Sequence, residues 1–252
     1  MKQIPNLFTL LNLVSGCIAI VFILQTGEML VTQNDEGSWI AQLPERIWWG
    51  AICIGIAAII DFLDGFVARL FKAESEMGKQ LDSLADIVSF GVAPGLILYQ
   101  LLRLSFIQEE SGLNTSLWAL APAVLVPCAG AWRLARFNID TGQSVVFKGV
   151  PIPAAGLVIA SLPLIIFYNY FGLAPLLINK WVLYLIILLI SWLMVSKLPL
   201  LSLKFKDASL KNNRAQYLLI GLGITAVLFL QWLAVPAIFA AYILLSVLVK
   251  KS

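Results

Sequence analysis

The stretch from residue 48 to residue 70 reads WWGAICIGIAAIIDFLDGFVARL, which is apolar up to residue 60 and then carries two aspartates. A helix needs about 20 apolar residues to cross the hydrocarbon layer of a bilayer, and this stretch has that length. At 1.5 Å per residue, Asp61 lies about 20 Å along such a helix. The stretch therefore predicts a membrane-spanning helix with acidic side chains inside the membrane.

The rest of the chain has the same character. Its 252 residues are 60% hydrophobic and 12% charged, a composition that excludes an ordinary water-soluble domain. We predict an all-α fold, a polytopic membrane helix bundle of about eight transmembrane helices that forms a single domain over residues 1–252. The predicted spans are residues 5–24, 48–70, 84–102, 117–135, 152–171, 181–196, 216–233 and 236–249.

The basic residues predict how the bundle is oriented, because Lys and Arg are retained on the cytoplasmic side. With both termini cytoplasmic, all but three of the 17 Lys and Arg residues fall on cytoplasmic segments, the exceptions being Arg46, Arg103 and Lys180. We expect a multi-pass protein of the cell or cytoplasmic membrane whose active site faces the cytoplasm. The net charge of +3 mostly reflects this topology. We expect membrane lipid to be a partner of the basic cytoplasmic surface, and nothing in the sequence indicates nucleic-acid binding.

Two more aspartates follow the opening stretch. Asp61 and Asp64 are three residues apart, Asp82 and Asp86 are four apart, and each pair therefore shares one helix face. A charge at the bilayer centre costs about 2.5 to 3.5 kcal/mol on insertion scales, and four acids also repel one another. Too few basic residues lie nearby in the sequence to neutralise all four. Divalent cations would do so directly, so the sequence predicts a metal site made of these four aspartates.

The residue types around this site narrow its chemistry. Oxygen ligands favour hard cations, so we expect Mg²⁺ or Mn²⁺. The chain contains no His, and any general base must be another residue type. Gly65, Ala68 and Gly78 are small residues beside the acids. They would allow either close helix packing or close approach of a nucleotide, and both interpretations stay open.

Residues 61–86 follow the pattern D-x2-D-G-x2-A-R-x8-G-x3-D-x3-D without a departure. The pattern resembles the signature of the CDP-alcohol phosphotransferases. That resemblance implies a membrane-embedded helical core, a pair of divalent cations, a homodimer, and transfer of a phosphoalcohol group with release of CMP. It also implies that Asp61, Asp64 and Asp82 are principal metal ligands and that Asp86 is both a ligand and the general base. The CDP-lipid is expected to contact Asn6, Thr9, Asp64, Gly65, Ala68, Arg69 and Gly78.

Three further segments resemble the serine-using branch of that family. They are IPNLFTLLN at residues 4–12, LADIVSFGVAP at 84–94, and RLARFN at 133–138 followed by FKGVPIP at 147–153. The resemblance implies CDP-diacylglycerol and L-serine as substrates. Transfer to another alcohol, and use of an archaeal ether lipid in place of diacylglycerol, are the alternatives.

Polar residues in two of these segments have two possible roles each. Asn6, Thr9 and Asn12 recur every three residues on one helix face, where they could line the metal site or make ordinary interhelical hydrogen bonds. Arg133 and Arg136 could anchor the end of the fourth span, or bind a phosphate or the carboxylate of the acceptor. In the functional interpretation, the serine and phosphate contacts are Arg133, Arg136, Asn138 and Lys148.

A cation-coupled transporter is the competing class, because acids inside membranes often mark ion pathways. A transporter would usually place its acids near the midplane on several helices. Here all four lie in one pair of consecutive helices near one membrane face. The arrangement favours the enzyme.

Overall fold

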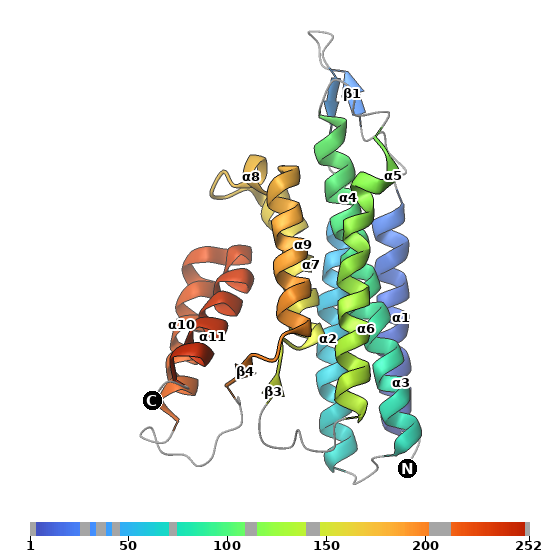
Figure 1. Ribbon diagram of the computed structural model, residues 1–252, viewed down its shortest axis with the longest axis vertical. Coiled ribbons are helices and arrows are strands. Elements are labelled where there is room, and N and C mark those ends of the chain that lie inside the picture. The colour runs from blue at the N-terminus through green and yellow to red at the C-terminus, as the bar shows by residue number, and fades with distance from the viewer. Residues whose placement is uncertain are drawn as a thin grey trace.

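The architecture is a bundle of helices that run side by side (Figure 1). The structure is a computed structural model and describes residues 4–25, 31–33, 39–41, 46–70, 75–108, 115–139, 147–201 and 213–249. The α-helices are α1 (Ile4–Leu24), α2 (Ile47–Leu70), α3 (Glu76–Asp86), α4 (Ala93–Ile107), α5 (Leu117–Leu120), α6 (Leu125–Ile139), α7 (Ile152–Tyr168), α8 (Ala174–Ile178), α9 (Lys180–Val195), α10 (Arg214–Leu230) and α11 (Ala234–Val249). The other elements are η1 (Ile87–Val92), η3 (Ala121–Val124), η4 (Gln231–Leu233), β1 (Val31–Gln33), β2 (Trp39–Ala41), β3 (Phe147–Lys148) and β4 (Pro199–Leu200).

Several helical runs have the dimensions of membrane spans. Within the described residues, five are long and apolar enough, namely Pro5–Leu24, Ile47–Leu70, Glu76–Ile107, Leu117–Ile139 and Arg214–Leu248, and two shorter apolar helices are α7 and α9. The prediction of a helical membrane protein is confirmed. The number of passes and the placement of the termini stay predictions.

The third span is longer than predicted, because α3, η1 and α4 form one helical run that begins after the cap residue Ser75. The two predicted spans at 216–233 and 236–249 correspond to α10 and α11. Between them Gln231, with a φ of 50°, turns the chain so that α10 and α11 pack against each other (Figure 1). Short elements were not predicted: the antiparallel pairs β1–β2 and β3–β4, and helix α8.

The segment η1 lies at the centre of the bundle, where it contacts α1, α4, α6 and α7. It is a π-helical turn that starts directly after Asp86, and such turns often occur at functional sites. The neighbouring helices can approach it closely because they present glycine. A Cβ atom at Gly156 of α7 would lie 3.0 Å from the backbone of Phe90, and Ser89 donates a 3.1 Å hydrogen bond to the carbonyl of Asn12 in α1.

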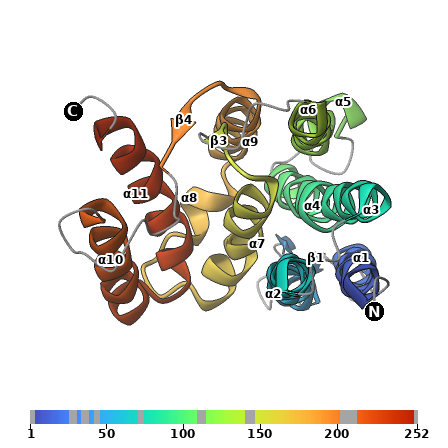
Figure 2. The ribbon, with the colours of Figure 1, turned by 90° about the horizontal axis from the view of Figure 1, so that it is seen from below.

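The C-terminal helices are joined to the rest of the chain through the short strands. Seen along the helices, α10 and α11 lie at the side of the bundle away from α1 and α6 (Figure 2). The Tyr242 hydroxyl of α11 donates to the Leu201 carbonyl at 3.0 Å, and the Leu201 amide donates to Ser246 at 3.0 Å. Leu201 follows β4, which pairs with β3. Next to β3, Gly149 has a φ of 76° and lies so close to the end of α9 that a Cβ would be 2.7 Å from the Met194 carbonyl.

Candidate metal and lipid site

Three of the predicted aspartates converge at one end of the bundle. Asp61 comes from the second half of α2, and Asp82 and Asp86 come from one face of α3. One carboxylate oxygen from each lies within 4.8 Å of the others. Asp86 is buried, and the other two are partly buried. The predicted meeting of two acidic helix faces is therefore present in the structure.

The first helix supplies hydrogen bonds to both acidic helices. Thr9 donates to Asp64 at 2.5 Å and Asn12 donates to Asp86 at 3.4 Å. Both donors are buried and neutral. Thr9 and Asn12 therefore make interhelical hydrogen bonds, and they make them to the acids themselves. The carboxylates are oriented by these bonds without being neutralised.

Asp64 lies beside the group of three without joining it. Its carboxylate accepts the Thr9 hydrogen bond and lines a cavity of about 740 Å³ that Asp82 also lines. The cavity has the size of a small-molecule site. Every residue that the resemblance assigns to the CDP-lipid lines it: Asn6, Thr9, Asp64, Gly65, Ala68, Arg69 and Gly78. The other lining residues are Asp82, which was predicted as a metal ligand, and five residues that were not predicted for the site: Pro5, Ser75, Glu76, Lys79 and Phe137.

The two glycines beside the acids both line the cavity but differ in the space around them. A Cβ at Gly65 would meet nothing within 4 Å, so this glycine borders open space. A Cβ at Gly78 would lie 3.0 Å from Ser75 Oγ and 3.1 Å from Asn6 Oδ1, so that glycine permits close helix packing. Gly65 therefore leaves room for a ligand, and Gly78 brings α1 and α3 together.

The two arginines of α6 have different surroundings. Arg136 donates a 2.8 Å hydrogen bond to the Val195 carbonyl at the end of α9. Arg133 lies close enough to Asp86 for their charges to interact, and its guanidinium carbon is 5.9 Å from the centroid of the Phe137 ring. Among the described residues its buried Nε has no hydrogen-bond partner. Arg133 is therefore the better placed of the two to bind a ligand near Asp86.

The remaining predicted contacts lie near the same end of the bundle. Asn138 donates to Ser83 of α3 at 2.9 Å, and Lys79 donates to the Asn138 carbonyl at 3.4 Å. Asn138 therefore joins α6 to the acidic helix. Lys148 belongs to β3, but its side chain lies outside the described part of the chain. Ser83 and Lys79 were missed as partners because nothing in the sequence pairs residues of α3 with residues of α6.

The donor set fits a hard divalent cation. The clustered donors are carboxylate oxygens from two helices, and oxygen ligands suit Mg²⁺ and Mn²⁺. Three close carboxylates inside an apolar bundle repel one another, and the donors from α1 bring no positive charge. A bound cation would offset that repulsion. The cluster is therefore compatible with metal binding.

Comparison with known proteins gives consistent matches. The family model described as CDP-alcohol phosphatidyltransferase matches residues 2–195. A CDP-diacylglycerol–serine O-phosphatidyltransferase of Bacillus subtilis (strain 168) is 31% identical over 187 residues, which cover 71% of this chain and 89% of that protein. A protein of the same name from Helicobacter pylori (strain J99) is 46% identical over 103 residues, or 40% of each chain. An archaetidylserine synthase of Methanothermobacter thermautotrophicus is 31% identical over 168 residues, covering 66% of this chain and 60% of that one.

Proposed function

The chain belongs to the CDP-alcohol phosphatidyltransferase family, and we propose that it transfers the phosphatidyl group of CDP-diacylglycerol to the hydroxyl of L-serine and releases CMP. The observation that carries this proposal is the convergence of Asp61, Asp82 and Asp86 beside a cavity of about 740 Å³. Carboxylates that can hold metal next to a space for a nucleotide are what phosphoryl transfer requires. Family membership also argues against the transporter.

In the proposed reaction, the serine oxygen forms a bond to the phosphorus that carries diacylglycerol, and the bond from that phosphorus to CMP breaks. Asp86 accepts the serine proton, and Asn12 holds the Asp86 carboxylate in place. Asp61, Asp64, Asp82 and Asp86 would hold a pair of Mg²⁺ or Mn²⁺ ions, which neutralise the charge of the diphosphate and of the departing CMP. Gly65 and Ala68 leave space for the nucleotide.

Serine would bind between Asp86 and Arg133. Its carboxylate suits the forked guanidinium of Arg133, whose buried Nε has no partner among the described residues. Its hydroxyl would then face Asp86. Arg136, Asn138 and Lys148 would complete the acceptor side, with Arg136 and Asn138 acting mainly through their contacts with neighbouring segments.

The proposed membrane arrangement is a single domain of eight passes. Both termini and the aspartates lie on the cytoplasmic side, as the distribution of Lys and Arg favours. Serine would enter from the cytoplasm, and the acyl chains of the donor would stay in the adjoining leaflet. The active protein would be a homodimer, as the family resemblance implies.

An ether-linked donor is the second candidate. The archaetidylserine synthase match covers 66% of this chain at 31% identity, close to the 71% and 31% of the Bacillus subtilis match. The side chains that line the cavity of about 740 Å³ would contact the nucleotide and phosphates of the donor. None of them distinguishes an ester from an ether bond farther along the lipid. Paired assays with an ester-linked and an ether-linked CDP-lipid would separate the two donors.

The acceptor is tested by measuring CMP release from purified protein with CDP-diacylglycerol and Mg²⁺. Separate reactions contain serine, inositol, glycerol phosphate or glycerol. We expect release with serine only, because the carboxylate-binding arginine and the base are arranged for an amino acid. Release with none of the four would overturn the proposed reaction, and release only with another acceptor would overturn the choice of serine.

Arg133→Ala is expected to raise the KM for serine by about tenfold or more, since a charge-assisted hydrogen bond contributes about 1.5 to 3 kcal/mol. The KM for CDP-diacylglycerol should change much less. Arg133→Lys keeps the charge but loses the fork, so it should restore binding only in part. The measurement is steady-state kinetics with each substrate varied in turn.

Arg136→Ala is the matched control for Arg133. Arg136 donates a hydrogen bond to the Val195 carbonyl. Its replacement by Ala should therefore lower the thermal unfolding midpoint and leave the KM for serine nearly unchanged. Equal increases in both substrates' KM values for Arg133→Ala would instead assign Arg133 to a phosphate of the donor.

A further inference from the structure

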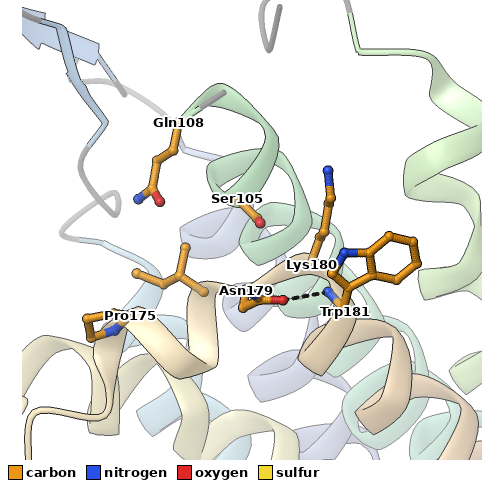
Figure 3. Close-up of a pocket in the computed structure, with 7 residues that line it drawn as sticks. Ser105, Gln108, Pro175, Asn179, Lys180 and Trp181 are labelled. Carbon is orange, nitrogen blue, oxygen red and sulfur yellow. Dashed lines mark hydrogen bonds between the residues drawn. The ribbon is translucent and has the colours of Figure 1, made fainter. Parts of the chain in front are cut away.

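A second cavity lies at the end of the bundle opposite to the aspartates (Figure 3). Its volume is about 400 Å³, and it is formed where α4 ends and α9 begins, with α8 alongside. Ser105 is 19 residues beyond Asp86 in one helical run, so the two lie about 28 Å apart along it at 1.5 Å per residue. That separation is close to the thickness of the hydrocarbon layer, about 30 Å. The cavity therefore belongs to the other membrane face.

Aromatic side chains mark this end as a membrane–water boundary. Trp48 of α2 contacts Phe167 of α7, with ring centroids 6.1 Å apart, and Tyr168 contacts Trp232 of η4 at 6.5 Å. Trp181 lines the cavity and is 70% exposed. Trp and Tyr gather at the headgroup level of membranes. The cavity thus lies at the depth of lipid headgroups.

The Ser105 hydroxyl lines this cavity and has no hydrogen-bond partner among the residues that the structure describes. Ser105 is 7% exposed, yet its hydroxyl makes no hydrogen bond within the described part of the chain. Buried hydroxyls normally have a partner, and a helical serine usually finds one in its own helix. Figure 3 shows this hydroxyl on the side of α4 that faces Asn179 and Lys180. A ligand oxygen in the cavity would supply the missing partner.

One basic side chain and one helix N-terminus lie at the same place. Asn179 caps α9 by accepting the Trp181 amide at 2.9 Å, so the positive end of the helix dipole points toward the cavity. Lys180 is one of the residues that line the cavity, and its ammonium lies 5.0 Å from the centre of the Phe106 ring. The Gln108 amide is also part of the lining. An anion with several oxygens would match these groups.

We propose that this cavity binds a phosphate group, supplied by a phospholipid of the leaflet opposite to the one that faces the aspartates. Lys180 and the start of α9 bind the charge, and Ser105 donates to a phosphate oxygen. Pro175 and Ile178, which line the apolar side of the cavity, favour a lipid over free phosphate because they would contact its glycerol and upper acyl carbons. The site is independent of the proposed reaction.

Native mass spectrometry of the purified full chain tests this site. The probes are dihexanoyl phosphatidylglycerol and, in a separate series, inorganic phosphate. The variants are the double substitution Ser105→Ala with Lys180→Gln, the charge-retaining Lys180→Arg, and Arg46→Gln. Arg46 is a matched control because it lies at the same end of the bundle, outside the cavity, bonded to Gln25.

We expect the double variant to bind the lipid at least about tenfold more weakly, the effect of losing one charge-assisted hydrogen bond. Lys180→Arg and Arg46→Gln should bind it as the unaltered chain does. Competition by inorganic phosphate at the same residues would assign the site to free phosphate as well as to lipid. Equal lipid binding by all variants, or no binding to the unaltered chain, would overturn the proposal. Because CMP release is assayed in the same samples, a failure of the proposed reaction is distinguishable from a failure of this site.

Discussion

Asp86→Asn is expected to lower the rate of CMP release by a factor of about 100 to 10,000, the range for loss of a general base. The amide has nearly the shape of the carboxylate but cannot accept the serine proton. Asn12 can still contact an amide oxygen at this position, so the packing of α1 against α3 should persist. Binding of CDP-diacylglycerol should therefore be retained. Turnover and lipid binding are measured on the same membrane-inserted protein.

Gln80→Ala is the control for this substitution. Gln80 is a polar residue of the same helix, exposed and outside both the carboxylate cluster and the lining of the cavity of about 740 Å³. Its replacement should leave turnover largely intact. Near-normal turnover by Asp86→Asn would remove Asp86 as the base, and loss of lipid binding would show that its main role is to hold metal.

Asp61→Asn is expected to lower turnover at least about 100-fold, because metal ions contribute several kcal/mol of charge stabilisation to such reactions. Asp61 is the carboxylate that α2 contributes to the cluster, and Asp82 and Asp86 are the two that α3 contributes. Its loss leaves the two acids of one helix without their partner from the other. Titration with Mn²⁺, followed by electron paramagnetic resonance, should show weaker binding.

The thermal unfolding midpoint of Asp61→Asn is a second measurement. We expect the substitution to change this midpoint in opposite directions in the absence and in the presence of divalent metal. Without metal, removing one of three close carboxylates relieves repulsion, so the unfolding midpoint should rise. With metal, the stabilisation that binding provides should largely disappear. A variant that kept the full metal-dependent rise in midpoint would contradict the assignment of Asp61 as a ligand.

The local part of the site could be predicted from the sequence because helix periodicity determines it. The spacing of Asp82 and Asp86 places both on one face of α3, and the apolar run before Asp61 requires a helix long enough to carry it into the membrane. The helical class of the fold follows from the same apolar runs. These inferences depend only on distances along one helix.

The parts that could not be predicted depend on how helices meet. Sequence spacing does not show that the packing of α1 against α2 brings Asp64 to Thr9, or that Asp64 lies beside the group of three carboxylates and not within it. Likewise, both arginines of α6 looked equivalent. Only the position of α9 shows that Arg136 is bonded to a backbone carbonyl there. The divided run at Gln231 was predicted as two spans, but its turn geometry was not.

The hydrogen bonds from Thr9 and Asn12 to the aspartates have a consequence for the order of synthesis. The clustered acids and the α1 side chains that donate to the aspartates lie between residues 9 and 86, on α1, α2 and α3. Arg133 and β3 come later in the chain. Under the proposed assignments, the residues that would hold metal are therefore translated before the residues that would bind serine, so the carboxylate site could assemble in the membrane before the acceptor site is complete.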